Sequence, residues 1–214
     1  MSLATLLVLA DGRLPGGGHA HSGGLEAAVA AGRIRDVEDV GGFLRGRLAT
    51  SGLVSATFAA VACARTGQWS DLDAGLDART PSPALRRASR AQGRALMRAG
   101  RAMWAVPAIR RDPHHPVALG VLAAAAGLGP LEAAVAAAHG TVTGPAGAAV
   151  RLLGLDPYAV HALLAGLAPE IDRLAADAAA RTGDRVDALP AASAPLLDIG
   201  AEIHATWEVR LFAS

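Results

Sequence analysis

The pattern of apolar and polar positions along the chain predicts helices almost throughout. Residues that favour helix N-caps stand in front of apolar segments, with Asp36 ahead of Val37 and Ser82 ahead of Pro83. Ser70 and Asp156 stand in the same position before two further segments. No run of β-branched and aromatic residues alternates with polar ones over more than a few positions. The sequence therefore predicts an all-α bundle of about eight to ten helices.

Two long stretches, residues 113–131 and 133–150, carry no charged side chain. Each is rich in Ala and Gly and is interrupted by Pro, so neither has the hydrophobicity of a membrane span. The residues from Gly127 to Pro130 indicate the end of one helix and the start of the next. We therefore expect two buried helices here and no membrane partner.

The composition supports one domain that spans residues 1–214. Hydrophobic residues make up 52% of the chain, but aromatic residues only 3%. A core of Ala, Leu and Val suits closely packed helices better than a sheet sandwich. A chain of 214 residues is long enough to bury one substantial core.

The ionisable residues exclude several kinds of chemistry. All 20 basic residues are arginine, and the absence of lysine excludes a Walker-type phosphate loop and a Schiff-base lysine. The net charge of +1 does not by itself indicate nucleic acid or a membrane surface. The single cysteine, Cys63, can form no internal disulfide, which fits a reducing cytoplasm.

The segment from residue 79 to residue 111 holds nine arginines and no acidic residue. Like charges four positions apart destabilise a helix, so this segment requires acidic partners. Those partners could be carboxylates of the same chain, an acidic partner protein, or the phosphates of nucleic acid, for which interleaved aromatic residues are missing. The arginines at this spacing are Arg86, Arg90, Arg94 and Arg98, and the candidate partners in the chain are Asp71, Asp73, Asp77 and the acidic residues of 170–187.

Residues 14–26 form a loop with five glycines and two histidines. Its glycine order fits neither the dinucleotide fingerprint nor the phosphate loop, and no strand precedes it. His19 and His21 could contact a metal together if the backbone is extended, but no Cys, Asp or Glu at a short spacing completes a site. A transient metal contact, a small metalloenzyme and an interface role all remain open. Ser22 is expected to cap the helix that follows.

Four segments, taken in order, resemble the urease accessory protein F family. Each motif is short, but all four occur in the family's order and spacing, and together they extend over essentially the whole chain. The segments are residues 6–17 with 22–26, residues 86–94, residues 148–152, and residues 195–199 with His204 and residues 210–214.

The resemblance implies an all-α accessory protein that is not an enzyme and that forms a homodimer. Members of the family join accessory protein D (also called H) and the GTPase, accessory protein G, in a complex that inserts nickel into the active site of urease. The implied role is a scaffold that recruits and regulates the GTPase and acts on the urease apoprotein. No stably bound cofactor is implied, because nickel is handled by the assembled complex. Nucleic acid and membrane are not among the implied partners, and the implied location is the cytoplasm.

The resemblance also implies which residues meet the partners. Arg210 would fold back towards the N-terminal loop to form the face that docks the GTPase, with Glu26 on that face. The tail and the N-terminal helix would contact the D/H protein. The loop of residues 11–24 and the tail of residues 208–214 are expected to depend on the partners for their arrangement. The partner-binding residues expected on this basis are Pro15, Gly16, Ser22, Gly24, Glu26, Arg90, Arg94, Arg210, Leu211, Phe212 and Ser214.

Overall fold

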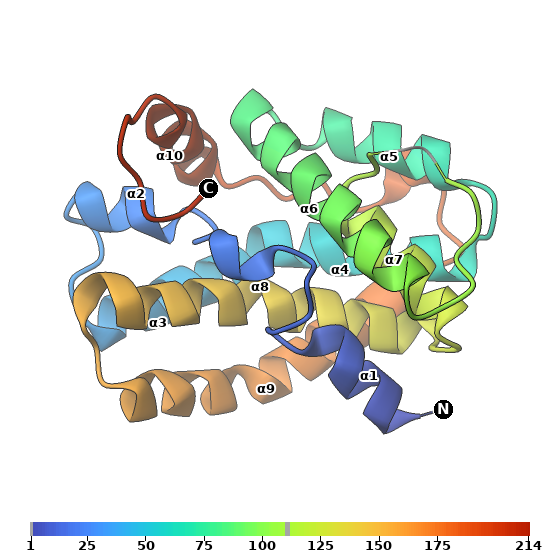
Figure 1. Ribbon diagram of the computed structural model, residues 1–214, viewed down its shortest axis with the longest axis horizontal. Helices are drawn as coiled ribbons and strands as arrows, with labels where there is room; N and C mark the ends of the chain where they lie inside the picture. Colours follow the sequence, from blue (N-terminus) through green and yellow to red (C-terminus); the bar gives the residue numbers. More distant parts are fainter. Residues whose placement is uncertain (1, 110–111) are drawn as a thin grey trace.

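The computed structural model describes residues 2–109 and 112–214, and these residues form an all-helical bundle without strands (Figure 1). The predicted fold class is therefore confirmed. The α-helices within the described ranges are α1 (Leu3–Ala10), α2 (Leu25–Ala30), α3 (Val37–Arg47), α4 (Leu53–Ala64), α5 (Trp69–Ala78), α6 (Pro83–Arg101), α7 (His115–Ala125), α8 (Pro130–Leu153), α9 (Pro157–Ala179) and α10 (Pro195–Ala205).

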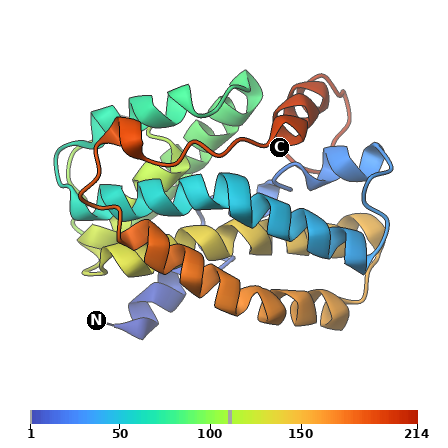
Figure 2. The same cartoon turned by 180° about the vertical axis from the view of Figure 1, so that it is seen from behind.

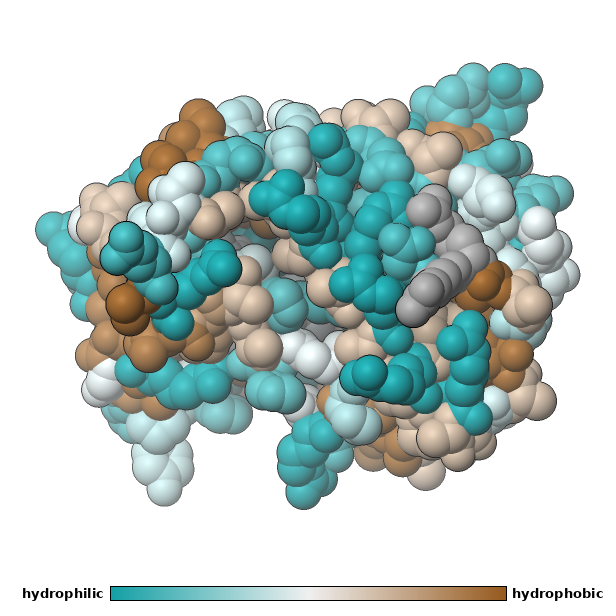
Figure 3. All heavy atoms as spheres, turned by 45° about the horizontal axis from the view of Figure 1, so that its top comes forward, coloured by the Kyte–Doolittle hydropathy of each residue, from teal (hydrophilic) through white to brown (hydrophobic). Residues whose placement is uncertain are grey.

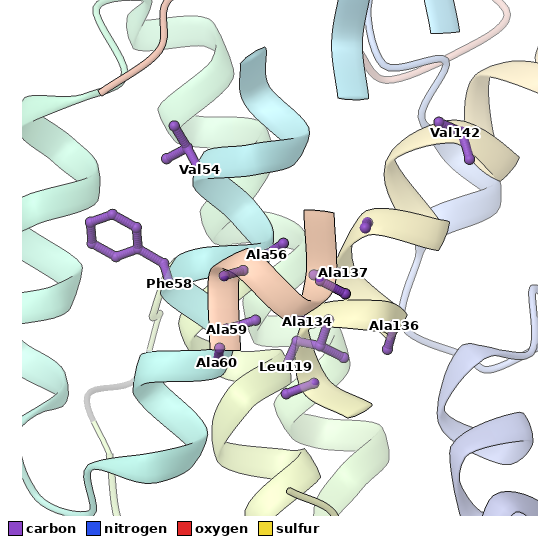
Figure 4. Packing of buried hydrophobic residues seen from close by; sticks show 14 of the residues in the cluster. Val54, Ala56, Phe58, Ala59, Ala60, Leu119, Ala134, Ala136, Ala137 and Val142 are labelled. Atoms are coloured by element: carbon purple, nitrogen blue, oxygen red, sulfur yellow. The ribbon is translucent and has the colours of Figure 1, made fainter. Parts of the chain in front are cut away.

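The centre of the bundle is formed by α4, α7, α8 and α9, which pack against one another. Small side chains fill most of it, with Phe58 among the few large ones (Figure 4). Because alanine has so short a side chain, the helix axes can approach closely over long stretches. The two charge-free stretches contain α7 and α8, which supply many of these buried residues, as the sequence predicted.

Gly120 shows how close α4 and α7 lie. A Cβ atom added at this position would stand 2.3 Å from the carbonyl oxygen of Ala59, which belongs to the backbone of α4. No side chain fits there without moving one of the helices. The contact between these two helices therefore depends on glycine at this position.

Helices α3 and α4 are joined through a π-helical turn, Leu48–Gly52, into one continuous helix. This helix, Val37–Ala64, is long and apolar enough to cross a membrane by length and composition. In the structure 61% of its most apolar window is buried inside the bundle, where it lies alongside α9 (Figure 2). Its hydrophobicity is therefore that of a core helix.

Most of the predicted helix starts are confirmed. The side chains of Asp36, Ser82 and Asp156 accept hydrogen bonds from the first turns of α3, α6 and α9. The prediction for Ser70 was wrong, because the N-cap is Gln68, two residues earlier, and α5 begins at Trp69. The buried indole of Trp69 donates a hydrogen bond to the carbonyl of Ala62 (3.0 Å), which draws this residue into the first turn.

The C-terminal segment meets the loop between α1 and α2 near one end of the bundle. Helix α10 packs against α2 and α6, and the chain beyond it turns back over the loop between α1 and α2 (Figure 1). The last residues thus lie against a segment almost two hundred positions earlier in the sequence. This arrangement builds the candidate site.

Candidate docking site

The C-terminal tail, residues 208–214, is hydrogen-bonded along the N-terminal loop. The amide of Ala213 donates to the carbonyl of Ala20 (2.7 Å). The amide and the hydroxyl of Ser22 both donate to the backbone oxygen of Ser214, over 2.6 Å and 2.9 Å. These bonds pair the two segments within the single chain.

Glu26 lies beneath the tail and holds it. Its side chain is only 6% exposed, and its carboxylate accepts bonds from the amides of Leu211 (2.8 Å) and Phe212 (3.1 Å). The third donor is the Nε2 atom of His204 in α10, at 2.7 Å. Burial alone would raise the pKa of Glu26, but these hydrogen bonds outweigh it, so the pKa is lowered. The carboxylate thus fastens the tail from below instead of facing outward.

Two glycines allow the loop to turn into α2. Gly23 and Gly24 have φ angles of +62° and +90°, in the region that L side chains avoid. The prediction that Ser22 occupies the N-cap was wrong in position, because the cap residue is Gly24 and α2 begins at Leu25. The Ser22 hydroxyl nevertheless accepts a bond from the amide of Glu26 (3.2 Å). Ser22 therefore links the start of α2 to the tail.

Two arginines that sequence reasoning did not place in the site also hold the loop and tail. The guanidinium of Arg151, from α8, lies 4.6 Å from the centre of the Phe212 ring and donates to the carbonyl of His19 (3.3 Å). Arg47, from α3, donates to the carbonyls of Gly23 and Thr141, and burial lowers its pKa to about 10. Arg151 follows directly after a charge-free stretch and lies within the motif of residues 148–152, but neither signal indicates that it contacts the tail.

The tail anchors some side chains and exposes others. Phe212 is buried, at 4% exposure, whereas its neighbour Leu211 is 74% exposed. Val209 and Arg210 also point into solvent. Because the backbone at Leu211 and Phe212 is tied to Glu26, these exposed side chains are presented from a fixed backbone. A fixed, exposed apolar group beside a cation is suited to bind another protein.

The two loop histidines have separate roles. Nδ1 of His21 lies 2.7 Å from the Ser214 hydroxyl oxygen, and burial lowers the pKa of this histidine. The side chain of His19 is exposed, and only its carbonyl is engaged, by Arg151. Over residues 2–109 and 112–214 no group of three His, Cys, Asp or Glu side chains is placed to hold a metal ion.

The other predicted partner-binding residues are distributed between the site and helix α6. Gly16 is buried against Leu96 of α6, and Pro15 is exposed beside it. Arg94 is exposed on α6. Arg90 is turned inward, away from any docking surface.

Arg90 belongs to an ionic network that joins α5, α6 and α7. Its guanidinium contacts Asp73 (2.9 Å) and Asp77 (2.5 Å). Asp77 is also bonded to the ring of His114 (3.0 Å), and the amide of His114 donates to Asp73 (2.7 Å). Of the acidic partners considered for the arginine segment, Asp73 and Asp77 are therefore confirmed for Arg90. Arg110 and Arg111 lie outside the described residues.

Comparison with known proteins places this arrangement in a family. Residues 34–168 match the model of the family described as UreF. The chain is 48% identical to the urease accessory protein UreF of Mycobacterium sp. (strain JLS) over 216 residues, which covers 100% of this chain and 99% of that protein. It is 46% identical to the UreF of Mycolicibacterium vanbaalenii and 41% identical to that of Mycobacterium tuberculosis (strain H37Rv), with the same coverage.

The chain belongs to the UreF family. The matched range begins after α2 and ends within α9, so the loop and the tail lie outside it. The alignments with the full-length UreF relatives extend over both segments. The resemblance noted from four short motifs is thus confirmed over the whole chain.

Membership in the UreF family also settles the broad class of the protein. The family is named for an accessory role towards urease, so the chain is an accessory protein and not an enzyme. Cys63 is buried, and burial raises the pKa of its thiol to about 11.

Proposed function

We propose that the protein acts in urease maturation as a scaffold that recruits and regulates the accessory GTPase, protein G, together with protein D/H. In this role it supports the insertion of nickel into the active site of the urease apoprotein in the cytoplasm. The observation that carries the proposal is the composite surface of loop and tail. Glu26 holds that surface from below, while Arg210 and Leu211 face outward.

The geometry favours a protein partner for this surface. Three consecutive exposed residues, 209–211, stand on a backbone that is fixed at both ends, by α10 on one side and by buried Phe212 on the other. Such pre-ordering reduces the entropy lost on binding. Arg210 adds a guanidinium that can form paired hydrogen bonds with a partner carboxylate.

Nickel is the cargo of the assembly and not a resident cofactor in this proposal. The chain supplies protein-binding surfaces, and the metal is held where several proteins meet. His19 and His21 lie close to the tail and could contact the metal only in company with ligands from another chain.

The experiment that tests the proposal is co-expression of the chain with proteins G and D/H and the urease subunits. Arg210→Ala is expected to reduce co-purification of the GTPase and urease activation, without a change in the unfolding temperature. Arg185→Ala removes an equally exposed arginine from a distant segment and serves as the matched control. Full co-purification and full activation with Arg210→Ala would refute the docking role.

We further propose that two copies of the chain associate through α2 and α10. Leu196, Ile199 and Ile203 are each more than half exposed along one face of α10. Ile199 and Ile203 also form one wall of a shallow cavity of about 210 Å³, whose other walls include Ala27 and Trp207. Figure 3 shows hydrophobic surface at this end of the molecule.

A second copy fits this face for geometric reasons. The apolar ridge adjoins the cavity on the same surface, so a two-fold rotation brings the ridge of each copy against the cavity of the other. Arg33 also lies at the cavity and supplies a positive charge to this face. Ile199→Glu is expected to reduce the mass measured by light scattering to that of one chain, 21.5 kDa. Leu131→Glu changes an exposed apolar residue elsewhere and should leave the dimer intact.

A further inference from the structure

The outer face of α6 carries a strip of exposed arginines. Arg87, Arg94, Arg98 and Arg101 are all exposed. With 3.6 residues per turn, they fall within an arc of about 60° around the helix axis. Figure 3 brings this side of the molecule forward and shows hydrophilic side chains gathered over it. The opposite face of α6 is buried and consists of Gly93, Leu96, Met97, Ala99 and Gly100.

Other arginines of the same helix are satisfied inside the fold. Arg90 pairs with Asp73 and Asp77, and Arg86 donates to the carbonyls of Thr80 (2.6 Å) and Pro81. These contacts explain why the helix needs arginine at two of its positions. These contacts do not explain why the outer positions of the helix are also arginine.

The strip has little counter-charge from the chain itself. Arg87 lies within electrostatic reach of Glu202 in α10. Among residues 2–109 and 112–214, the side chains of Arg94, Arg98 and Arg101 make no hydrogen bond or ion pair. Like charges at four-residue spacing destabilise an isolated helix by a few tenths of a kcal/mol per pair, roughly, so the strip carries a cost that the chain does not offset.

The position of the strip connects it to the docking site. A Cβ added at Gly17 of the loop would lie 3.7 Å from the Cβ of Ala95, and one at Gly16 would lie 3.2 Å from Cδ1 of Leu96. Ala95 follows Arg94 directly, so the strip borders the loop that carries the tail. A protein that covers the loop and the tail can extend over α6 without a gap.

We propose that the strip formed by Arg94, Arg98 and Arg101 binds an acidic surface of the protein that docks on the loop and tail. The three guanidinium groups follow one line of about 10 Å along the helix, which matches carboxylates at similar spacing on a partner helix. Nucleic acid fits the strip less well. Helix α6 offers no aromatic side chain for base stacking, and the whole chain has a net charge of only +1.

The test uses the full chain with purified proteins G and D/H. The triple charge reversal Arg94→Glu, Arg98→Glu and Arg101→Glu is compared with the triple Lys variant, which keeps the charge. A second control reverses Arg35, Arg173 and Arg185, three exposed arginines elsewhere. Each variant is first checked for an unchanged unfolding temperature, so that loss of fold is not mistaken for loss of binding.

The strip is expected to act through charge. The reversal at α6 should weaken partner binding at least about tenfold and remove most of its dependence on salt, whereas the Lys variant stays within about threefold. An unchanged affinity and salt dependence in the reversal variant, with binding of the wild type intact, would overturn this inference alone. Failure of the wild type to bind either protein would overturn the proposed function on which it rests. Salt-sensitive binding of duplex DNA or RNA that only the reversal abolishes would assign the strip to nucleic acid instead.

Discussion

Two acidic clusters hold distant segments of the chain together, and they do so with different partners. At the docking site, the Glu26 carboxylate is bound by two backbone amides of the tail and by His204. In the core, Asp73 and Asp77 are bound by Arg90 and by His114. One cluster fastens a peptide segment to a surface, and the other joins three helices.

This difference indicates which of the two clusters the stability of the fold depends on. The core cluster lies beside the extensive contact between α6 and α7, so its loss would leave the charge of Asp73 buried without a cation. The tail contributes one buried side chain, Phe212, and is otherwise held by hydrogen bonds. Segments with few buried contacts open at lower free energy than the core does. We therefore expect the core cluster to control stability and the Glu26 cluster to control the docking surface.

The largest effect is expected from Arg90→Ala. This change leaves Asp73 buried without its cation, and the free energy of unfolding should fall by about 3–5 kcal/mol. Urea denaturation followed by circular dichroism measures it. Arg98→Ala, on the exposed face of the same helix, should stay within about 0.5 kcal/mol of the wild type. Equal effects of the two changes would show that the inward-facing and outward-facing arginines of α6 contribute equally to the free energy of unfolding.

Glu26→Gln should lower the free energy of unfolding by less, on the order of 1–3 kcal/mol. The glutamine side chain places an NH₂ group against backbone donors that need an acceptor. The tail should exchange its amide hydrogens faster while helices α4 and α8 stay protected. Glu38→Gln, at an exposed position of α3, is the control. Loss of protection throughout the bundle would mean that Glu26 supports the fold and not only the tail.

Protonation of Glu26 at low pH should release the tail, as the Glu26→Gln change does. Because hydrogen bonds to the tail hold the pKa of Glu26 in the folded chain below the ordinary glutamate value of 4.5, its contribution to stability is complete above that pH and is lost as the pH falls through the folded pKa. The fluorescence of Trp207, whose ring lies 4.8 Å from that of His204, can report the change. A transition centred well above pH 4.5 would point to a different titrating group. In the Glu26→Gln variant this transition should be absent.

The smallest effect is expected from Arg151→Gln. It removes a cation from the face of the Phe212 ring and a donor from the carbonyl of His19, for a loss of about 0.5–2 kcal/mol confined to the tail. Hydrogen exchange of residues 208–214 is the measurement. Arg173→Gln on the exposed surface of α9 should leave that exchange unchanged. An effect on core helices would contradict a local role.

The helices could be predicted because their signals are local. Asp36, Ser82 and Asp156 begin helices as side-chain caps, and the charge-free stretches became core helices. Ser70 shows the limit of this reasoning, since α5 starts two residues earlier than an N-cap at Ser70 implies, where the Trp69 indole makes a tertiary hydrogen bond. The pairing of Arg90 with Asp73 and Asp77 was within reach because an arginine segment without acids requires nearby carboxylates.

The docking site could be predicted only in part. The approach of the tail to the loop came from the family resemblance, and its bonds join residues 185 positions apart, beyond the reach of any local pattern. Glu26 was expected on the docking face, whereas the structure buries it beneath the tail. Burial of this kind depends on the packing of α10 over α2, which the periodicity of either helix does not reveal. Arg47 and Arg151 were missed for the same reason.

The central claim is that the loop and the tail form one ordered surface fastened by Glu26. Hydrogen exchange at the amides of Leu211 and Phe212 in the free chain at neutral pH tests it most directly, because both amides donate to that carboxylate. The account predicts exchange at least about tenfold slower than in an unstructured peptide, and loss of this protection in Glu26→Gln. Exchange at the unstructured rate in the wild-type chain would contradict it.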